Sequence, residues 1–223
     1  MTTAQISVLS SGTDGQIAAL TTKQINSLTS AQVAKLSVDQ VAAFTTEQAA
    51  NLTTSQVASM TTTQLVKMET SDFAALTSDR LASLTSTQVG ALTTDQLVAL
   101  TTQQASAMTA TQVKGFTTAQ LSKLETQDLA AFTTSAVAGL SGAQLSGLTT
   151  DEIRSITTTQ VSAITATALK SLTTAQIQAL TTGQLPELTT EQVNALTTVQ
   201  IDALTTAQIV TLETADLAAL STT

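Results

Sequence analysis

The sequence repeats with a period of eight residues, and this period constrains the fold more than any other feature. Written in octads with positions a to h, the series runs from Leu20 to Ala219 without insertion or deletion, which makes 25 octads. Residues 92–99, for example, read Leu-Thr-Thr-Asp-Gln-Leu-Val-Ala. Residues 1–19 form an irregular start, in which 1–8 is an octad, 9–11 an insertion and 12–19 a degenerate octad. Because no linker interrupts the array, the sequence predicts a single repeat domain over residues 1–223.

Each position of the octad has its own character. Positions a and f are apolar in every octad, and position e is Gln in 18 of 25. Position b is Thr or Ser in 22 of 25 octads and Glu in the other three, whereas position c is Thr or Ser in 21. Position h is mostly Ala, Ser or Gly. The pattern accounts for most of the 49 threonines among the 223 residues.

Neither a continuous helix nor a continuous strand can accommodate this pattern. In an α-helix, eight residues advance by about 800°, so the apolar stripe would drift by about 80° in each octad. In a strand, the odd spacings between positions a and f would send successive apolar side chains to opposite faces. The chain must therefore turn within every octad.

A short helix in each octad fits the pattern. Thr at b and Gln at e have the spacing of a capping box, so b is the expected N-cap and c to h form about one and a half turns. Thirteen of the 15 acidic residues in the 25 octads lie at b, d or e, and six of the eight basic residues lie at g or h. The helix macrodipole favours this polarity.

Helices of six residues are not stable alone in water. They must stack on their neighbours, and the small residues at h let adjacent helices approach closely. The sequence therefore predicts an all-α solenoid, or superhelix, with one very short helix per octad. A β-solenoid is the alternative, because Thr, Val and Ile favour strands and stacked Thr and Gln side chains form ladders.

The composition excludes several classes of function. The chain has no His and no Cys, so it lacks an imidazole base, a thiolate nucleophile and the usual zinc ligands. Eight basic residues against sixteen acidic ones give a net charge of −8, which argues against nucleic-acid binding. The apolar runs are far too short for membrane insertion. The sequence predicts a protein that is not an enzyme and uses no cofactor.

Three octads depart from the consensus in the same way, with Glu at b and Asp at e. The pairs are Glu69 and Asp72, Glu125 and Asp128, and Glu213 and Asp216. Paired carboxylates are typical of a hard-cation site such as Ca²⁺, or of an acid–base pair. Two carboxylates are few for Ca²⁺, and helix N-termini favour acids in any case. We therefore predict no metal site and treat these six residues as weak candidates only.

Written as Leu-Thr-Thr-x-Gln-(Val/Ile/Leu)-x-Ala, the octad resembles repeat regions of large bacterial surface or secreted proteins, including adhesin-like and filament-like ones. The resemblance extends from Met1 to Leu220. It implies a structural protein, an elongated spacer or stalk or a self-associating filament subunit at a bacterial cell surface, and it carries over no catalytic or binding residue. Residues 1–5 show neither the basic nor the apolar stretch of a signal peptide, so export without a visible N-terminal signal is expected.

Two further expectations concern partners. Repeat arrays normally need polar caps, and neither end of this array is clearly capped, so we expect self-association end to end. The alternative function is a binding module that uses one face of the solenoid for a peptide, a glycan or an ion. An ice-binding array of Thr side chains belongs to this alternative, although capping already explains where the Thr residues lie.

Overall fold

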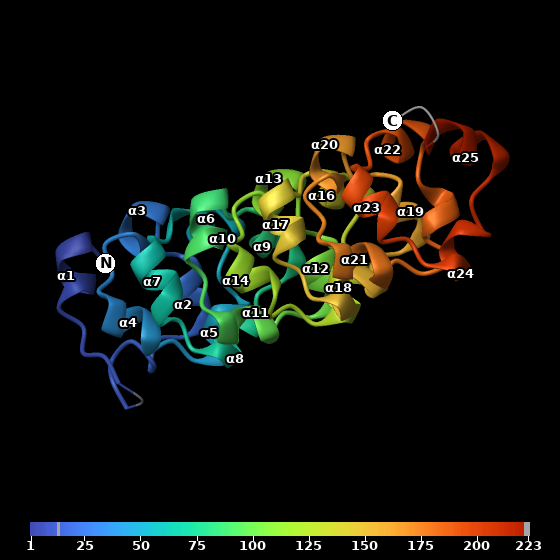
Figure 1. Ribbon diagram of the computed structural model, residues 1–223. Helices are drawn as coiled ribbons and strands as arrows, with labels where there is room; N and C mark the ends of the chain where they lie inside the picture. The colour runs from blue at the N-terminus through green and yellow to red at the C-terminus, as the bar shows by residue number, and fades with distance from the viewer. Residues whose placement is uncertain (13, 221–223) are drawn as a thin grey trace. The chain divides into compact units, whose positions relative to one another are not determined.

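All the regular secondary structure in the described part of the chain is helical. The structure is a computed structural model that describes residues 1–12 and 14–220. Short α-helices and one 3₁₀-helix follow one another along the chain, and the described residues contain no strand (Figure 1). The prediction of an all-α repeat solenoid is thereby confirmed, and the strand-based alternative is not.

The chain divides into two compact units, Met1–Met108 and Thr109–Thr223. In the first unit the helices are α1 (Thr3–Ser7), α2 (Thr22–Asn26), α3 (Ser30–Val33), α4 (Val38–Ala42), α5 (Thr46–Ala50), α6 (Thr54–Ser59), α7 (Thr62–Lys67), α8 (Thr70–Ala74), α9 (Ser78–Ala82), α10 (Ser86–Ala91), α11 (Thr94–Val98) and α12 (Thr102–Ser106). In the second they are α13 (Ala110–Val113), α14 (Thr118–Leu121), α15 (Thr126–Ala131), α16 (Thr134–Ala138), α17 (Gly142–Ser146), α18 (Thr150–Ser155), α19 (Thr158–Val161), α20 (Ala166–Leu169), α21 (Thr174–Ala179), η1 (Leu185–Glu187), α22 (Thr190–Asn194), α23 (Thr198–Asp202), α24 (Thr206–Ile209) and α25 (Thr214–Leu220).

Each α-helix begins where the capping box predicts. In α11 the N-cap is Thr93, with the extended backbone (φ −74°, ψ 158°) that an N-cap adopts. The amide of Gln96 donates to Thr93 Oγ1 at 3.2 Å, and the amide of Thr93 donates to Gln96 Oε1 at 3.1 Å. At the other end, the amide of Leu100 donates to the Leu97 carbonyl at 3.1 Å and closes the turn. The same reciprocal pair starts every α-helix whose octad has Gln at e.

In most octads, three positions form the core. Leu97 at f and Leu100 at the next a are 0% and 6% exposed, as the apolar pattern predicts. Gln96 at e is only 1% exposed, although it is polar. The residues at b and d lie mostly at the surface. The burial of position e is not part of the sequence prediction, and its reason lies in the contacts between turns.

Within each unit the helices stack as a superhelix. Helices three octads apart contact one another, such as α4 and α7 in the first unit and α15 and α18 in the second. Side-chain hydrogen bonds join residues 28 and 31 apart, which is between three and a half and four octads. One turn of the superhelix therefore contains between three and four octads.

The small residues at position h lie where two turns meet. A Cβ atom on Gly139 would lie 2.8 Å from the carbonyl oxygen of Ala110, at position c of an octad three octads earlier. A Cβ atom on Gly147 would lie 2.9 Å from Cβ of Thr118, in the same relation. Glycine is required at such close approaches because any side chain would push the turns apart.

The insertion near the N-terminus lies further along the chain than the sequence indicated. The amide of Ser10 donates to Gln16 Oε1 at 3.1 Å, and the amide of Gln16 donates to Ser10 Oγ at 3.0 Å. Ser10 and Gln16 thus take positions b and e, with three extra residues between them, and Ile17 is the buried f residue. Placing the insertion at 9–11 was wrong, because Leu9 and Ser10 belong to the octad. Gly12, inside the insertion, has a φ of 108°, which favours glycine.

The octad that contains Pro186 departs from the α-helix without losing its packing. Proline has no amide to donate, and a 3₁₀-helix, η1, replaces the α-helix over Leu185–Glu187. Leu185 at f is still 0% exposed. The amide of Thr181 still donates to Gln184 Oε1 at 2.7 Å. The irregularity of this octad therefore stays local.

Candidate functional site

The glutamine at position e joins two turns of the superhelix. In Gln56, Oε1 accepts from the amide of Thr53 at 2.7 Å, at the start of α6. Its Nε2 donates to the carbonyl oxygens of Ile25 and Leu28, both at 2.8 Å, at the end of α2. Helix ends leave backbone groups unsatisfied, and one buried amide here serves the start of one helix and the end of another.

The same link, which we call the glutamine link, recurs in both units. In the second unit, Gln176 donates from Nε2 to the carbonyl oxygens of Leu145 at 2.8 Å and Leu148 at 2.7 Å. Links within a unit are made by Gln40, Gln48, Gln56, Gln64, Gln88, Gln96, Gln104, Gln144, Gln160, Gln176, Gln184, Gln192, Gln200 and Gln208. Each turn is therefore tied to the preceding one through buried polar contacts, in addition to apolar packing.

The octads without Gln at e keep only part of this arrangement. Arg80 donates from Nη1 to the carbonyl of Ala50 at 2.6 Å, so it supplies the donor, but its helix has no side-chain cap. Ala168 keeps the cap, because its amide donates to Thr165 Oγ1 at 3.2 Å, but it has no side-chain donor. Glu152 keeps both halves of the capping box and replaces the amide donor with a carboxyl oxygen.

The three Glu/Asp octads separate their two carboxyl groups. Asp72, Asp128 and Asp216 occupy the core position e and are 3%, 1% and 5% exposed. Glu69, Glu125 and Glu213 lie at the surface. Glu69 and Glu125 are N-cap residues whose side chains make no cap hydrogen bond. The shorter Asp side chain thus replaces Gln in the core, and Glu69 and Glu125 replace the Thr cap without taking over its hydrogen bond.

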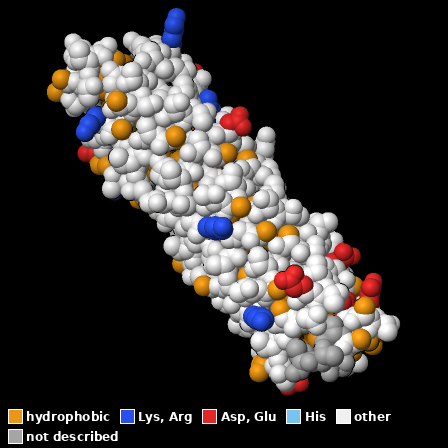
Figure 2. Space-filling view, turned by 90° about the horizontal axis from the view of Figure 1, so that it is seen from above, with side chains coloured by type: hydrophobic (Ala, Val, Ile, Leu, Met, Phe, Trp, Pro, Cys, Tyr) orange, Lys and Arg blue, Asp and Glu red, His pale blue; other side chains and the backbone are white. Residues whose placement is uncertain are grey.

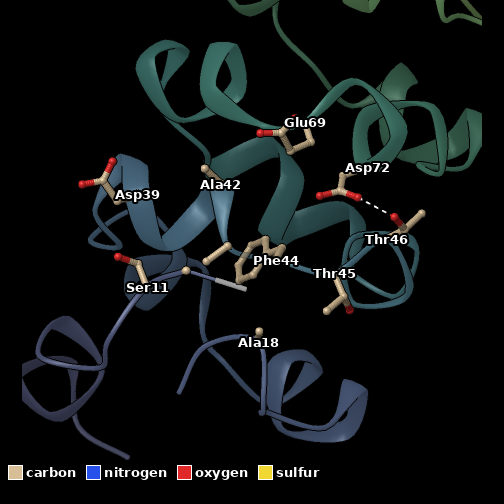
Figure 3. Close-up of a pocket in the computed structure, with 11 residues that line it drawn as sticks. Ser11, Ala18, Asp39, Ala42, Phe44, Thr45, Thr46, Glu69 and Asp72 are labelled. Atoms are coloured by element: carbon tan, nitrogen blue, oxygen red, sulfur yellow. Dashed lines mark hydrogen bonds between the residues drawn. The ribbon is translucent and has the colours of Figure 1, made fainter. Parts of the chain in front are cut away.

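Glu69 and Asp72 line one pocket of about 690 Å³ in the first unit (Figure 3). Phe44, Ala42 and Asp39 also line it. Thr46 donates from Oγ1 to Asp72 Oδ1 at 2.7 Å, and Ser71 Oγ lies 3.4 Å from the same oxygen. Burial raises the pKa of Asp72 above its ordinary value, a shift that the Thr46 and Ser71 hydrogen bonds oppose and the nearby Glu69 reinforces.

The described residues do not bring three or more candidate metal ligands together anywhere. In the pocket, Asp39, Glu69 and Asp72 point in different directions (Figure 3). Glu125 accepts a hydrogen bond from Gln127, a surface contact within one octad. Among the described residues, no helix has the length and apolarity needed to cross a bilayer.

The donor role of the glutamines is the functional feature that sequence reasoning missed. A capping box needs only an acceptor at e, which Glu supplies as well as Gln. Yet position e is Gln in 18 octads and Glu in one. That preference is the signal of a required donor, because Glu and Gln differ at this position mainly in the Nε2 group.

Comparison with known protein families identifies the repeat. A family model described as the ALTTAQ repeat matches residues 13–46, 65–102, 121–158, 153–190 and 182–214, which together make up more than half of the chain. Residues 203–208 read Ala-Leu-Thr-Thr-Ala-Gln, which corresponds to position h followed by positions a to e. A search of curated proteins found no match to this chain.

Proposed function

The chain belongs to the ALTTAQ repeat family, and from this premise we propose that it serves as a structural spacer or stalk at a bacterial cell surface. The observation that carries the proposal is the glutamine link. It recurs in successive turns of each unit, and each glutamine bonds to carbonyl groups at equivalent positions of the preceding turn. Stability in such an array is a sum of repeat and nearest-neighbour terms, so octads extend the array without changing its local structure.

The surface supports a structural role over a chemical one. Figure 2 shows charged side chains as separate groups on a face made mostly of neutral atoms. The side chains that vary between octads lie mainly at position d, which is mostly exposed, and at position g, which is exposed or half-buried, while the linked positions repeat. We therefore propose that the chain has no catalytic activity. Its proposed role is that of a spacer, whose length is set by the number of octads.

The test is to change the number of octads. Removal of residues 188–203 takes out two octads, and removal of residues 172–203 takes out four, both in register. If the chain is a spacer, the maximum dimension measured by small-angle X-ray scattering should decrease with each deletion. The decrease relative to the unaltered chain should be twice as large when four octads are removed as when two are removed, and the cross-section should not change. A cross-section that changes with octad number contradicts the proposal. Protease accessibility of the protein on intact cells tests the surface location separately.

A filament subunit is the second candidate function, and the last described octads favour it. Ile209 and Leu217, both at position f, are each 41% exposed, whereas Val193 at the same position is 1% exposed. The first glutamines, such as Gln24, keep exposed side chains. We propose that a second copy of the chain packs its first octads there, in a head-to-tail contact that extends into filaments.

Sedimentation velocity tests this contact. The mean sedimentation coefficient should rise with concentration in the unaltered chain and stay constant in a variant that carries both Ile209→Lys and Leu217→Lys. Val199→Lys is the matched control, because Val199 is 65% exposed at position d, outside the proposed contact. Association that persists in the double variant would rule out this surface.

A further inference from the structure

One octad of the second unit carries an acid in place of the linking amide. Glu152 lies at position e and is 3% exposed. Its Oε2 accepts from the amide of Thr149 at 2.6 Å, and its own amide donates to Thr149 Oγ1 at 3.2 Å. The capping half of the glutamine link is therefore complete. The other carboxyl oxygen, Oε1, is the atom that corresponds chemically to the amide nitrogen Nε2 of glutamine.

The neighbouring octads show which hydrogen bonds the amide nitrogen at position e donates. Gln144 donates to the carbonyl oxygens of Val113 and Phe116, both at 2.8 Å. Gln160 donates to Leu129 at 3.1 Å, and to residue 132 as well. By the same spacings of 31 and 28 residues, the carbonyls that correspond to Glu152 are those of residues 121 and 124.

A carboxylate and a carboxylic acid behave differently against these carbonyls. An ionised carboxylate only accepts hydrogen bonds, so it cannot bond to a carbonyl oxygen. The carbonyl of Leu121 also belongs to the C-terminal end of α14, where the macrodipole disfavours a negative charge. A protonated carboxyl has an O–H group and can donate as the glutamine amide does.

The charges around Glu152 are few and partly cancel. Asp151 precedes it on α18 and pairs with Arg154 at 2.8 Å. α15 packs against α18 and carries Asp128, with Glu125 just before it, whereas α21 on the other side has no charged residue. Burial is the main cause that raises the pKa of Glu152, and Asp151 adds to it. The Thr149 hydrogen bonds and the Lys123 ammonium act in the opposite direction.

We propose that Glu152 is a proton-dependent link between two turns of the superhelix. With its proton, the carboxyl group donates to the carbonyl of residue 121 or 124 and joins the turns as glutamine does. Without the proton, this link is absent and the junction between the turns is weaker. The octads on either side keep amide links through Gln144 and Gln160, so in this part of the second unit the proton acts at one junction. This inference concerns the regulation of the proposed spacer.

The expected direction with pH follows from linkage. A carboxyl group whose pKa is raised by folding stabilises the fold below its ordinary value of 4.5 and loses that contribution as the pH rises through the folded-state pKa. Glu152→Gln supplies a donor at every pH. The variant and the unaltered chain should therefore melt alike at low pH, and the variant should melt higher by about 2–4 °C near neutral pH.

The experiment measures melting temperature between about pH 4 and pH 8 and hydrogen exchange of the amides around residues 121–124 and 149–152. Glu191→Gln is the matched control, because Glu191 is exposed at position d and should give no pH-dependent difference. Gln160→Glu should install the same pH dependence at a second junction.

An equal gain at all pH values, or the same pH-dependent gain in Glu191→Gln, would overturn the proposal. Absence of any pH-dependent difference in both Glu152→Gln and Gln160→Glu would overturn it as well. Failure here leaves the proposed spacer untouched, because scattering from the octad deletions measures that function independently.

Discussion

Gln176 donates a hydrogen bond from Nε2 to the carbonyl oxygen of Leu148, 28 residues earlier, at 2.7 Å. The same side chain accepts at Oε1 from the amide of Thr173 at 2.8 Å. A capping pair, which is a local device of helix starts, therefore also forms the polar contact between turns. Because the side chain is 2% exposed, the loss of either contact leaves backbone groups buried without partners.

Gln176→Ala should destabilise the second unit by about 2–3 kcal/mol, because it removes one cap acceptor and the donor to two buried carbonyls. Urea unfolding followed by far-ultraviolet circular dichroism measures the change in the free energy of unfolding. Gln178→Ala is the control, because Gln178 is exposed at position g of the same octad and should change stability little. Equal losses in both variants would contradict a role for the link.

Gly139→Ala should cost more stability than Gly147→Ala. The new Cβ atom at residue 139 meets a main-chain oxygen of Ala110 at 2.8 Å, which cannot move without shifting a helix. At residue 147 it meets the Thr118 side chain at 2.9 Å. Overpacking of this kind typically costs about 1–3 kcal/mol. Thermal melts of the two variants decide the order.

Asp72→Asn should raise the melting temperature near neutral pH by about 2–4 °C and change it little in acid. Burial raises the pKa of Asp72, so folding disfavours the charged form, and the stability of the unaltered chain falls as the pH rises above the ordinary value of 3.8. Asp79→Asn, at an exposed position d, is the control. If the melting temperatures of the two variants change alike across the pH range, the buried carboxyl group of Asp72 is not the cause of the pH dependence.

Calcium should leave the melting temperature unchanged up to millimolar concentration. Ca²⁺ takes six to eight oxygen ligands, and no three candidate ligands come together among the described residues. The measurement is a thermal melt with and without the cation, with Mg²⁺ alongside. A rise of several degrees that Glu69→Gln abolishes would instead place a site in the pocket beside Asp72.

Much of the local structure could be predicted from the octad. The N-caps, the helix starts and the burial of positions a and f follow from contacts within three or four residues, which the sequence displays directly. The pocket beside Asp72 could not be predicted in the same way. It depends on stacking, which brings Thr46 to Asp72 and places Ser11 in the wall of the same pocket. The position of the N-terminal insertion likewise became visible only from the bond between Ser10 and Gln16.

The sequence by itself determined that each octad forms a short helix, with a Thr cap, a Gln partner and two apolar side chains that must be buried. Only the tertiary structure decided that three to four octads make one turn and that the amide of Gln reaches the carbonyls 28 and 31 residues earlier. The physical reason is that a capping box is satisfied within one octad, whereas the partner of Nε2 depends on how far the chain advances in a full turn. A period of eight leaves that advance open, and the packing of buried side chains at f and the next a sets it.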